Sequence, residues 1–176
     1  MPLKEGEEGE REPEYIKVGQ DEWKVIEEGA GAETSGLGPC IGIVIHDTES
    51  KKAIVGHFSN PDHNPNFNPE DDRADEDDSF LGMVERAKKL FKDPKKVVVY
   101  IGGGGYDISS SEIRNPKKLK RQKAHTKRVR SFVEEKLKES GFENLKIQYH
   151  NADDTTIMII NTDTGVVNYD THNTLE

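Results

Sequence analysis

Short blocks of apolar residues alternate with polar or glycine-rich segments along the chain, and the length of each block predicts an element. Blocks of strand length, bounded by turn-forming residues, predict about seven strands, which lie within residues 15–26, 41–45, 53–58, 97–101, 145–149, 156–160 and 166–169. The glycine-rich residues 29–40 predict a turn-rich approach to the 41–45 strand. The short connection between the 41–45 and 53–58 blocks predicts a β-hairpin.

Two segments show helical periodicity instead. Ser79 is a helix-capping residue, and after it apolar side chains recur every three or four positions as far as Phe91. A second amphipathic pattern runs through the basic stretch 117–130 and ends at Gly141. Because these helices are interspersed among hairpins, we expect an α+β fold, with a mixed sheet and helices packed on its outside.

Composition narrows the possible functions. The chain has 176 residues, which suits one domain, and 25 Lys and Arg against 34 Asp and Glu give a net charge of −9. An acidic chain lacks the basic footprint that general nucleic-acid binding requires, and it disfavours adsorption to anionic lipid. We therefore expect neither nucleic acid nor a lipid surface among its partners.

The first residues predict no targeting or membrane segment. Residues 1–14 carry six glutamates and no apolar core, so we expect a disordered acidic leader rather than a signal peptide. No apolar run approaches the roughly 18 residues of a membrane helix, so we expect no membrane insertion. The resulting expectation is a cytoplasmic protein with one folded domain over residues 15–172.

One cysteine and one histidine are brought together by the predicted hairpin. A turn centred between Thr48 and Glu49 would place Cys40 directly opposite His57, with Cβ atoms roughly 4.5–5.5 Å apart. A register slip of one residue would send the two side chains to opposite faces.

This pairing has a chemical meaning. An imidazole beside a thiol takes its proton and generates the nucleophilic thiolate, and a third group often orients the imidazole. Thr34 could supply that orienting oxygen, while Gly36 and Gly38 allow a tight turn that aims N–H groups at an oxyanion. The competing interpretation is that Cys40 is a small buried strand residue.

The residues around Cys40 resemble a known family. The run from Thr34 to Val44, TSGLGPCIGIV, is similar to the Thr…GLGSC-plus-strand signature of CheD, the chemoreceptor glutamine deamidases. His57, in VGHF, occupies the place of the family's histidine. Weaker similarity extends over roughly residues 16–169, in the segments 16–20, 98–104 and 156–167. The cytotoxic necrotizing factor-like deamidases are similar more distantly.

The resemblance implies a CheD-like mixed β-sandwich with helices outside and hydrolysis of a protein glutamine amide to glutamate and ammonia. In that activity Cys40 forms a thioester, His57 is the base and Thr34 orients it, without cofactor or metal. The implied partners are a chemoreceptor or another glutamine-bearing protein, such as a host-cell protein, and a CheC-type regulator.

Three features depart from the family. Pro39 replaces a small serine beside the nucleophile, residues 70–78 hold seven acids, and the basic 114–130 segment is enlarged. From the acidic residues we expect an acidic rim near the site, which would favour a basic target.

Other chemistries remain open. A non-catalytic binding module would use the acidic loop and the basic helix as contact surfaces. A metal-dependent hydrolase would use His57 and His63. Gly102–Gly105 follow a strand but lack the Lys-Ser/Thr of a phosphate-binding loop, so we expect a glycine turn beside the active site.

Overall fold

The computed structural model describes residues 15–105, 115–150 and 154–173. These residues form two α-helices, α1 (Phe80–Leu90) and α2 (Pro116–Glu139), and short 3-10 turns at Ala74–Glu76 and Pro94–Lys96. They also form nine strands: β1 (Tyr15–Lys17), β2 (Glu22–Ile26), β3 (Gly31–Leu37), β4 (Ile41–Asp47), β5 (Ala53–Phe58), β6 (Val97–Gly103), β7 (Leu145–Tyr149), β8 (Asp154–Asn161) and β9 (Val166–Asn173).

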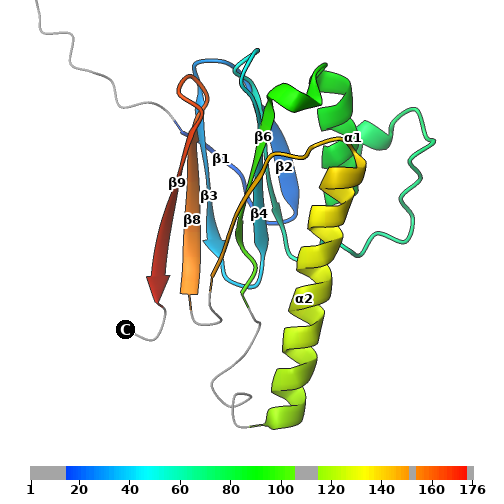
Figure 1. Ribbon diagram of the computed structural model, residues 1–176, viewed down its shortest axis with the longest axis vertical. Helices are drawn as coiled ribbons and strands as arrows, with labels where there is room; N and C mark the ends of the chain where they lie inside the picture. Colours follow the sequence, from blue (N-terminus) through cyan, green and yellow to red (C-terminus); the bar gives the residue numbers. More distant parts are fainter. Residues whose placement is uncertain (1–14, 106–114, 151–153, 174–176) are drawn as a thin grey trace, which may run out of the picture.

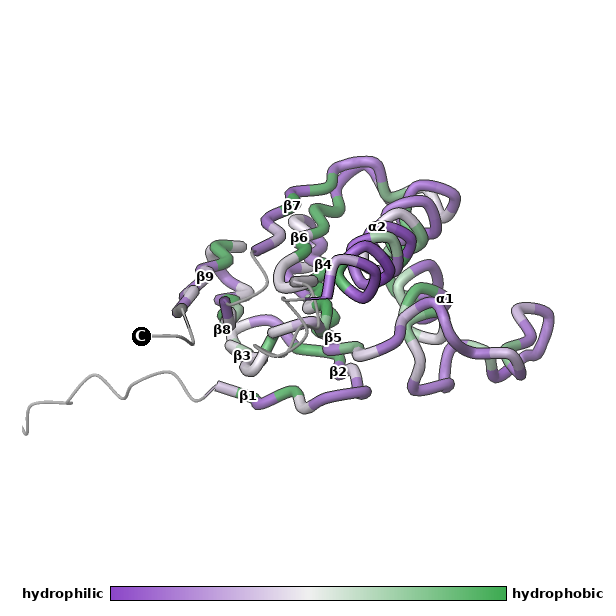
Figure 2. The backbone as a smooth tube through the Cα atoms, turned by 90° about the horizontal axis from the view of Figure 1, so that it is seen from below, coloured by the Kyte–Doolittle hydropathy of each residue, from purple (hydrophilic) through white to green (hydrophobic). Residues whose placement is uncertain are grey.

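The strands make two mixed sheets. One has the order β1-β3-β8-β9 and the other the order β2-β5-β4-β6-β7, with a parallel pair in each, β1 with β3 and β6 with β7. Figures 1 and 2 show three layers, in which the five-stranded sheet lies between the four-stranded sheet and the two helices. This arrangement confirms the expected α+β fold with helices on the outside.

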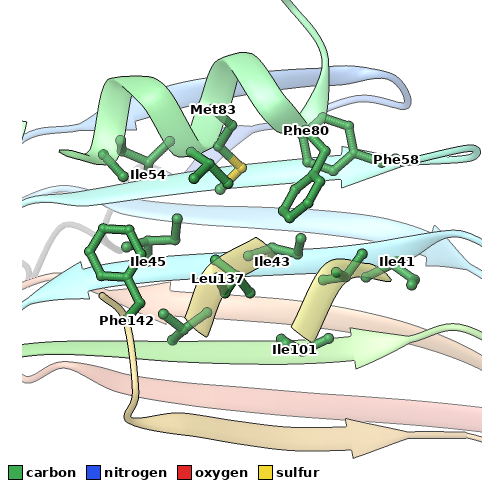
Figure 3. Close-up of a cluster of buried hydrophobic side chains, with 14 of the residues drawn as sticks. Ile41, Ile43, Ile45, Ile54, Phe58, Phe80, Met83, Ile101, Leu137 and Phe142 are labelled. Atoms are coloured by element: carbon green, nitrogen blue, oxygen red, sulfur yellow. The ribbon is translucent and has the colours of Figure 1, made fainter. Parts of the chain in front are cut away.

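The middle sheet is buried on both faces. On β4 every residue is buried, and successive side chains point alternately toward the helices and toward the other sheet. Ile41, Ile43 and Ile45 join the cluster that includes α1 and α2, shown in Figure 3, whereas Val44 joins the cluster between the sheets. A strand covered on both faces accounts for the continuous apolar run in the sequence.

Helix boundaries follow the local signals. The Ser79 hydroxyl accepts a hydrogen bond from the Gly82 N–H at 3.3 Å, and the Asn115 side chain caps the start of α2 in the same way. Gly141, with a φ of +92°, follows the end of α2. Both predicted helices are therefore confirmed.

One prediction about the strands was wrong. The glycine-rich residues 29–40 contain β3, which lies between β1 and β8, and residues 15–26 form two strands, β1 and β2. The described residues therefore hold nine strands and not about seven. Ala32, Thr34 and Leu37 are buried, but few of the residues in this segment are apolar and Gly36 interrupts the alternation, so no sequence pattern shows it. The register of β3 against β8 shifts between Thr34 and Leu37, where Gly36 has a φ of +73°.

Two further expectations concern the ends and the membrane. The predicted acidic leader, residues 1–14, lies outside the described residues. Within the described residues, neither helix has the length and apolar content that a membrane span requires.

Candidate functional site

His57 faces Gly42 across the β4–β5 hairpin, not Cys40 as the sequence predicts. The connection is centred one residue later than expected, because Asp47 pairs with Lys52 and leaves residues 48–51 as the loop. Two contacts stabilise this loop: the Asp47 carboxylate accepts hydrogen bonds from the N–H groups of Glu49 and Ser50, at 3.2 and 3.3 Å.

The predicted pairing was wrong by two residues, so Cys40 and His57 still lie on the same face of the hairpin. Cys40 precedes β4 and lies diagonally from His57, on the side of the hairpin that faces the four-stranded sheet. Diagonal neighbours have Cα atoms roughly 7–8 Å apart, which is within reach of a long or aromatic side chain. Gly42, opposite His57, has no side chain, and the side chains of Leu37 and Met158 fill the place where its Cβ would lie.

Thr34 comes to His57 from the other sheet. Its Oγ1 lies 2.9 Å from His57 Nδ1, and its hydroxyl donates to the carbonyl oxygen of Val18 at 2.8 Å. A hydroxyl has one hydrogen to donate, so Nδ1–H must be the donor to Thr34. The neutral ring therefore carries its proton on Nδ1 and its lone pair on Nε2.

The electrostatic surroundings keep this imidazole neutral. Burial lowers the pKa of His57 below its usual value of 6.5, although the carboxylates of Asp21 and Glu22 act in the opposite direction. His57 is only 3% exposed, and its Nε2 has no hydrogen-bond partner among the described residues. A buried nitrogen with a lone pair and no partner is suited to accept a proton.

Cys40 lies beside a cleft of about 870 Å³ and is 7% exposed. Turns from two segments surround its backbone: Gly38 N–H donates to Gly36 O at 2.9 Å, and Gly104 N–H donates to the Cys40 carbonyl at 2.8 Å. The predicted glycine turn beside Cys40 is thus confirmed for Gly104 and Gly105, which also line the cleft. Because His57 Nε2 is unpartnered among the described residues, it makes no hydrogen bond to the Cys40 thiol.

His150 contacts the turn before Cys40, a role that the sequence did not predict. Its Nε2 donates to Gly38 O at 2.7 Å, and its Nδ1 lies 3.2 Å from Thr156 Oγ1. The same Gly38 carbonyl accepts the N–H of Gly105 at 3.0 Å. No motif identified this histidine, because its contact depends on pairing between distant segments.

Arg130 is a second residue that the motifs missed. Its guanidinium donates through Nε and Nη2 to Gly104 O, at 2.9 and 2.5 Å, and lies 4.3 Å from the centre of the Tyr149 ring. Arg130 therefore links α2 to the turn at Gly104, beside Cys40.

The acidic loop is not a rim of this site, which corrects the sequence expectation. Asp75 is buried against α1, where it pairs with Arg86 at 3.1 Å and Lys89 at 2.6 Å. Asp77 O accepts the Trp23 indole N–H at 2.9 Å. No residue of 70–78 lines the cleft, whereas α2 contributes several basic residues to it.

The proposed metal pair finds little support in the geometry. The Nδ1 of His57 is engaged by Thr34, and His63 lies exposed in the loop after β5. The part of the chain that the structure describes contains no group of three or more His, Cys, Asp and Glu side chains that could hold a metal ion.

Fold and site together define a class: a two-sheet α+β protein in which a threonine–histidine pair lies behind a cysteine at a cleft. Comparison with known proteins confirms the resemblance to CheD. A curated relative in Haloarcula marismortui, named probable chemoreceptor glutamine deamidase CheD, is 53% identical over 49 residues, 28% of each chain. No family model matches the chain.

Two further relatives carry the same name. Chemoreceptor glutamine deamidase CheD of Bacillus licheniformis is 36% identical over 61 residues, 35% of this chain and 36% of the relative. Probable chemoreceptor glutamine deamidase CheD of Caldanaerobacter subterraneus subsp. tengcongensis is 29% identical over 107 residues, 59% of this chain and 66% of the relative. The matches thus span between 28% and 66% of the length of these relatives.

Proposed function

We propose that the chain is a protein-glutamine deamidase and that residues 15–172 form its catalytic domain. Cys40 Sγ attacks the carboxamide carbon of a glutamine side chain, and His57 Nε2 takes the thiol proton. His57 then gives that proton to the departing nitrogen, and ammonia leaves behind a thioester. Water adds to the thioester carbon, releases the Cys40 thiol and leaves glutamate.

The observation that carries this proposal is the state of His57. Thr34 engages Nδ1, burial favours the neutral ring, and the lone pair of Nε2 is unpartnered on the face where Cys40 lies. A general base needs this combination, and the missing contact to the thiol is the kind that closes when substrate binds. Thr34 would hold the ring in the tautomer that accepts the proton.

The names of the relatives support the same reaction. They also support a chemoreceptor as the substrate. From the resemblance to CheD we further propose that a CheC-type protein regulates the chain, and from the sequence that both meet it in the cytoplasm. Gly36 and Gly38 shape the turn that presents Cys40, and we propose that this turn supports the oxyanion of the tetrahedral intermediate.

The first experiment needs no substrate. The rate of Cys40 alkylation by iodoacetamide is measured against pH in the unaltered chain and in His57→Ala. The rate should be higher in the unaltered chain than in His57→Ala between about pH 6.5 and 8.5, because the neutral imidazole takes the thiol proton as Sγ attacks. The two rates should converge above about pH 8.5, where an ordinary thiol is already ionised. Release of ammonia from chemoreceptor fragments, absent in Cys40→Ala, then tests the reaction itself.

A second candidate is a binding module with the same fold. It is favoured by the low exposure of Cys40 and by the absence of a Cys40–His57 hydrogen bond. A thiol that reacts slowly, with a pH dependence unchanged in His57→Ala, would support this module and refute the deamidase.

A further inference from the structure

The cleft beside Cys40 has one basic wall. Three arginines and a histidine of α2 line it: Arg121, His125, Arg128 and Arg130. The lining residues Gln20, Ser59 and Asn60, from other segments, carry no charge, although Ser59 donates to the Asp21 carboxylate at 2.7 Å. Among the described residues no aspartate or glutamate lines the cleft, although the whole chain has a net charge of −9.

The basic wall is a continuous stripe. Arg121, His125 and Arg128 are spaced four and three residues apart, so they share one side of the helix. Arg128 Nη2 donates to His125 Nδ1 at 3.4 Å. From Pro116 to Val133 α2 contains no acidic residue, so no carboxylate within this stretch opposes the stripe.

The arginines of the wall have different roles. Arg130 contacts the Gly104 carbonyl and the Tyr149 ring, so it belongs to the structure around Cys40. Arg121 and Arg128 are exposed and line the open part of the cleft. A guanidinium in that position presents paired N–H donors that match a carboxylate.

We propose that Arg121 and Arg128 select target glutamines that have acidic residues beside them in the substrate. Cys40 lines the cleft and is only 7% exposed, so a glutamine side chain must enter the cleft to reach it while the neighbouring substrate residues stay beside α2. The inference rests on the proposed deamidase function, and it assigns the substrate charge that the site prefers.

The net charge of the chain does not oppose this preference. Fields between exposed charges fade over a distance of roughly 8–10 Å at ordinary salt, so the nearest charges decide what enters the cleft. The acids of residues 70–78 do not line the cleft, and Asp75 is neutralised by Arg86 and Lys89.

The test uses peptides that share one glutamine and differ only in its neighbours, which are glutamate, alanine or lysine. Ammonia release and mass spectrometry give kcat/KM for each peptide. The glutamate peptide should react about tenfold faster than the alanine peptide, and the lysine peptide should be slowest. Raising the salt from about 0.05 M to about 0.5 M should compress these differences.

Two matched variants assign the effect to the cleft. In Arg121→Glu/Arg128→Glu the order of the peptides should reverse, and Arg121→Gln/Arg128→Gln should leave little preference. Lys92→Glu/Lys138→Glu makes the same change in net charge at exposed positions outside the cleft, and it should retain the original order.

The outcomes separate this inference from the proposed function. Equal kcat/KM for the three peptides, with ammonia released from all, would overturn the selection by Arg121 and Arg128 and leave the deamidase standing. Loss of the preference for the glutamate peptide in Lys92→Glu/Lys138→Glu would also overturn it. No ammonia from any peptide, together with an inert Cys40 thiol, would refute the function and this inference with it.

Discussion

The two faces of the β4–β5 hairpin differ in chemistry although they share one backbone. The face toward the helices is apolar and packs Ile43 and Phe58 against α1 and α2. The face toward the four-stranded sheet is apolar in the middle but carries His57 at one end and His46 at the other. Period-two alternation thus lets one hairpin serve the hydrophobic core with one face and the candidate site with the other.

The difference shows how a buried polar pair is tolerated. Thr34 and His57 satisfy each other across the two sheets, and the Thr34 hydroxyl also satisfies Val18 O. Within this pair, His57 Nε2 is the one atom without a partner among the described residues, and it is the atom that the proposed reaction uses; at the other end of the same face His46 Nδ1 also lacks a partner. Changes at the Thr34–His57 end of this face should therefore reduce activity, and changes to the other face should reduce stability.

The largest effect is expected for His57→Gln. Loss of the general base should lower kcat/KM for deamidation by about 10²- to 10⁴-fold, with a small change in the urea midpoint. The matched control is His46→Gln, since His46 is buried on the same face and bonds Thr162 O at 2.9 Å, at the other end of β4. Comparable losses of activity in both variants would contradict the division between the two ends.

Phe80→Ala tests the opposite face. Phe80 is fully buried and packs edge-on against Phe58 and Phe132, so its removal should cost about 3–5 kcal/mol of unfolding free energy. Urea titration measures the loss, and Phe80→Leu should cost less because it fills more of the volume. Activity per folded molecule should stay unchanged in both variants. A loss of activity without a loss of stability would contradict the assignment of this face to the hydrophobic core.

Thr34→Val removes a hydroxyl at nearly constant volume. The imidazole then loses its preference for the Nδ1–H tautomer, and kcat should fall about tenfold to a hundredfold. Steady-state kinetics measure this, with Thr162→Val as the control for losing another buried hydroxyl. If Thr34→Val retained full kcat, Thr34 would be a packing residue only.

His150 should act by positioning the turn before Cys40. His150→Ala removes the donor to Gly38 O, and the alkylation rate of Cys40 should fall about tenfold. His150→Gln keeps an N–H donor and should recover most of the rate. Failure of glutamine to rescue would mean that the hydrogen bond is unimportant.

The smallest effect concerns pH. The base must be neutral, so kcat/KM should be constant above the pKa of His57 and fall as the pH drops through it, below 6.5. Asp21 raises that pKa, and Asp21→Asn should therefore move the acidic limb to lower pH. Asp163→Asn, in the distant β8–β9 turn, should leave the limb unmoved; an equal shift in both variants would refute the local effect.

Local patterns predicted much of the fold. Ser79 and Gly141 mark helix ends through capping and backbone preferences that act within a few residues. The β4–β5 hairpin followed from its apolar blocks in the same way. β3 escaped prediction because its neighbours β1 and β8 stabilise it, and those contacts are distant in sequence.

In the candidate site, too, some features follow from local sequence and others depend on contacts between distant segments. The sequence determined the residue types and, through alternation, that Cys40 and His57 share a face. The turn at residues 48–51 decided the register, and only tertiary structure placed Thr34 against the imidazole. These contacts depend on the packing of two sheets, which no local pattern records.

The distribution of charge shows most clearly what the sequence alone does not determine. The sequence determined that residues 70–78 are acidic and that 117–130 are basic, but not which segment would border Cys40. Tertiary structure packed the acids against α1 and laid α2 along the cleft. The reason is physical: charge is a property of each residue, whereas the field at a site depends on which residues the fold brings near it.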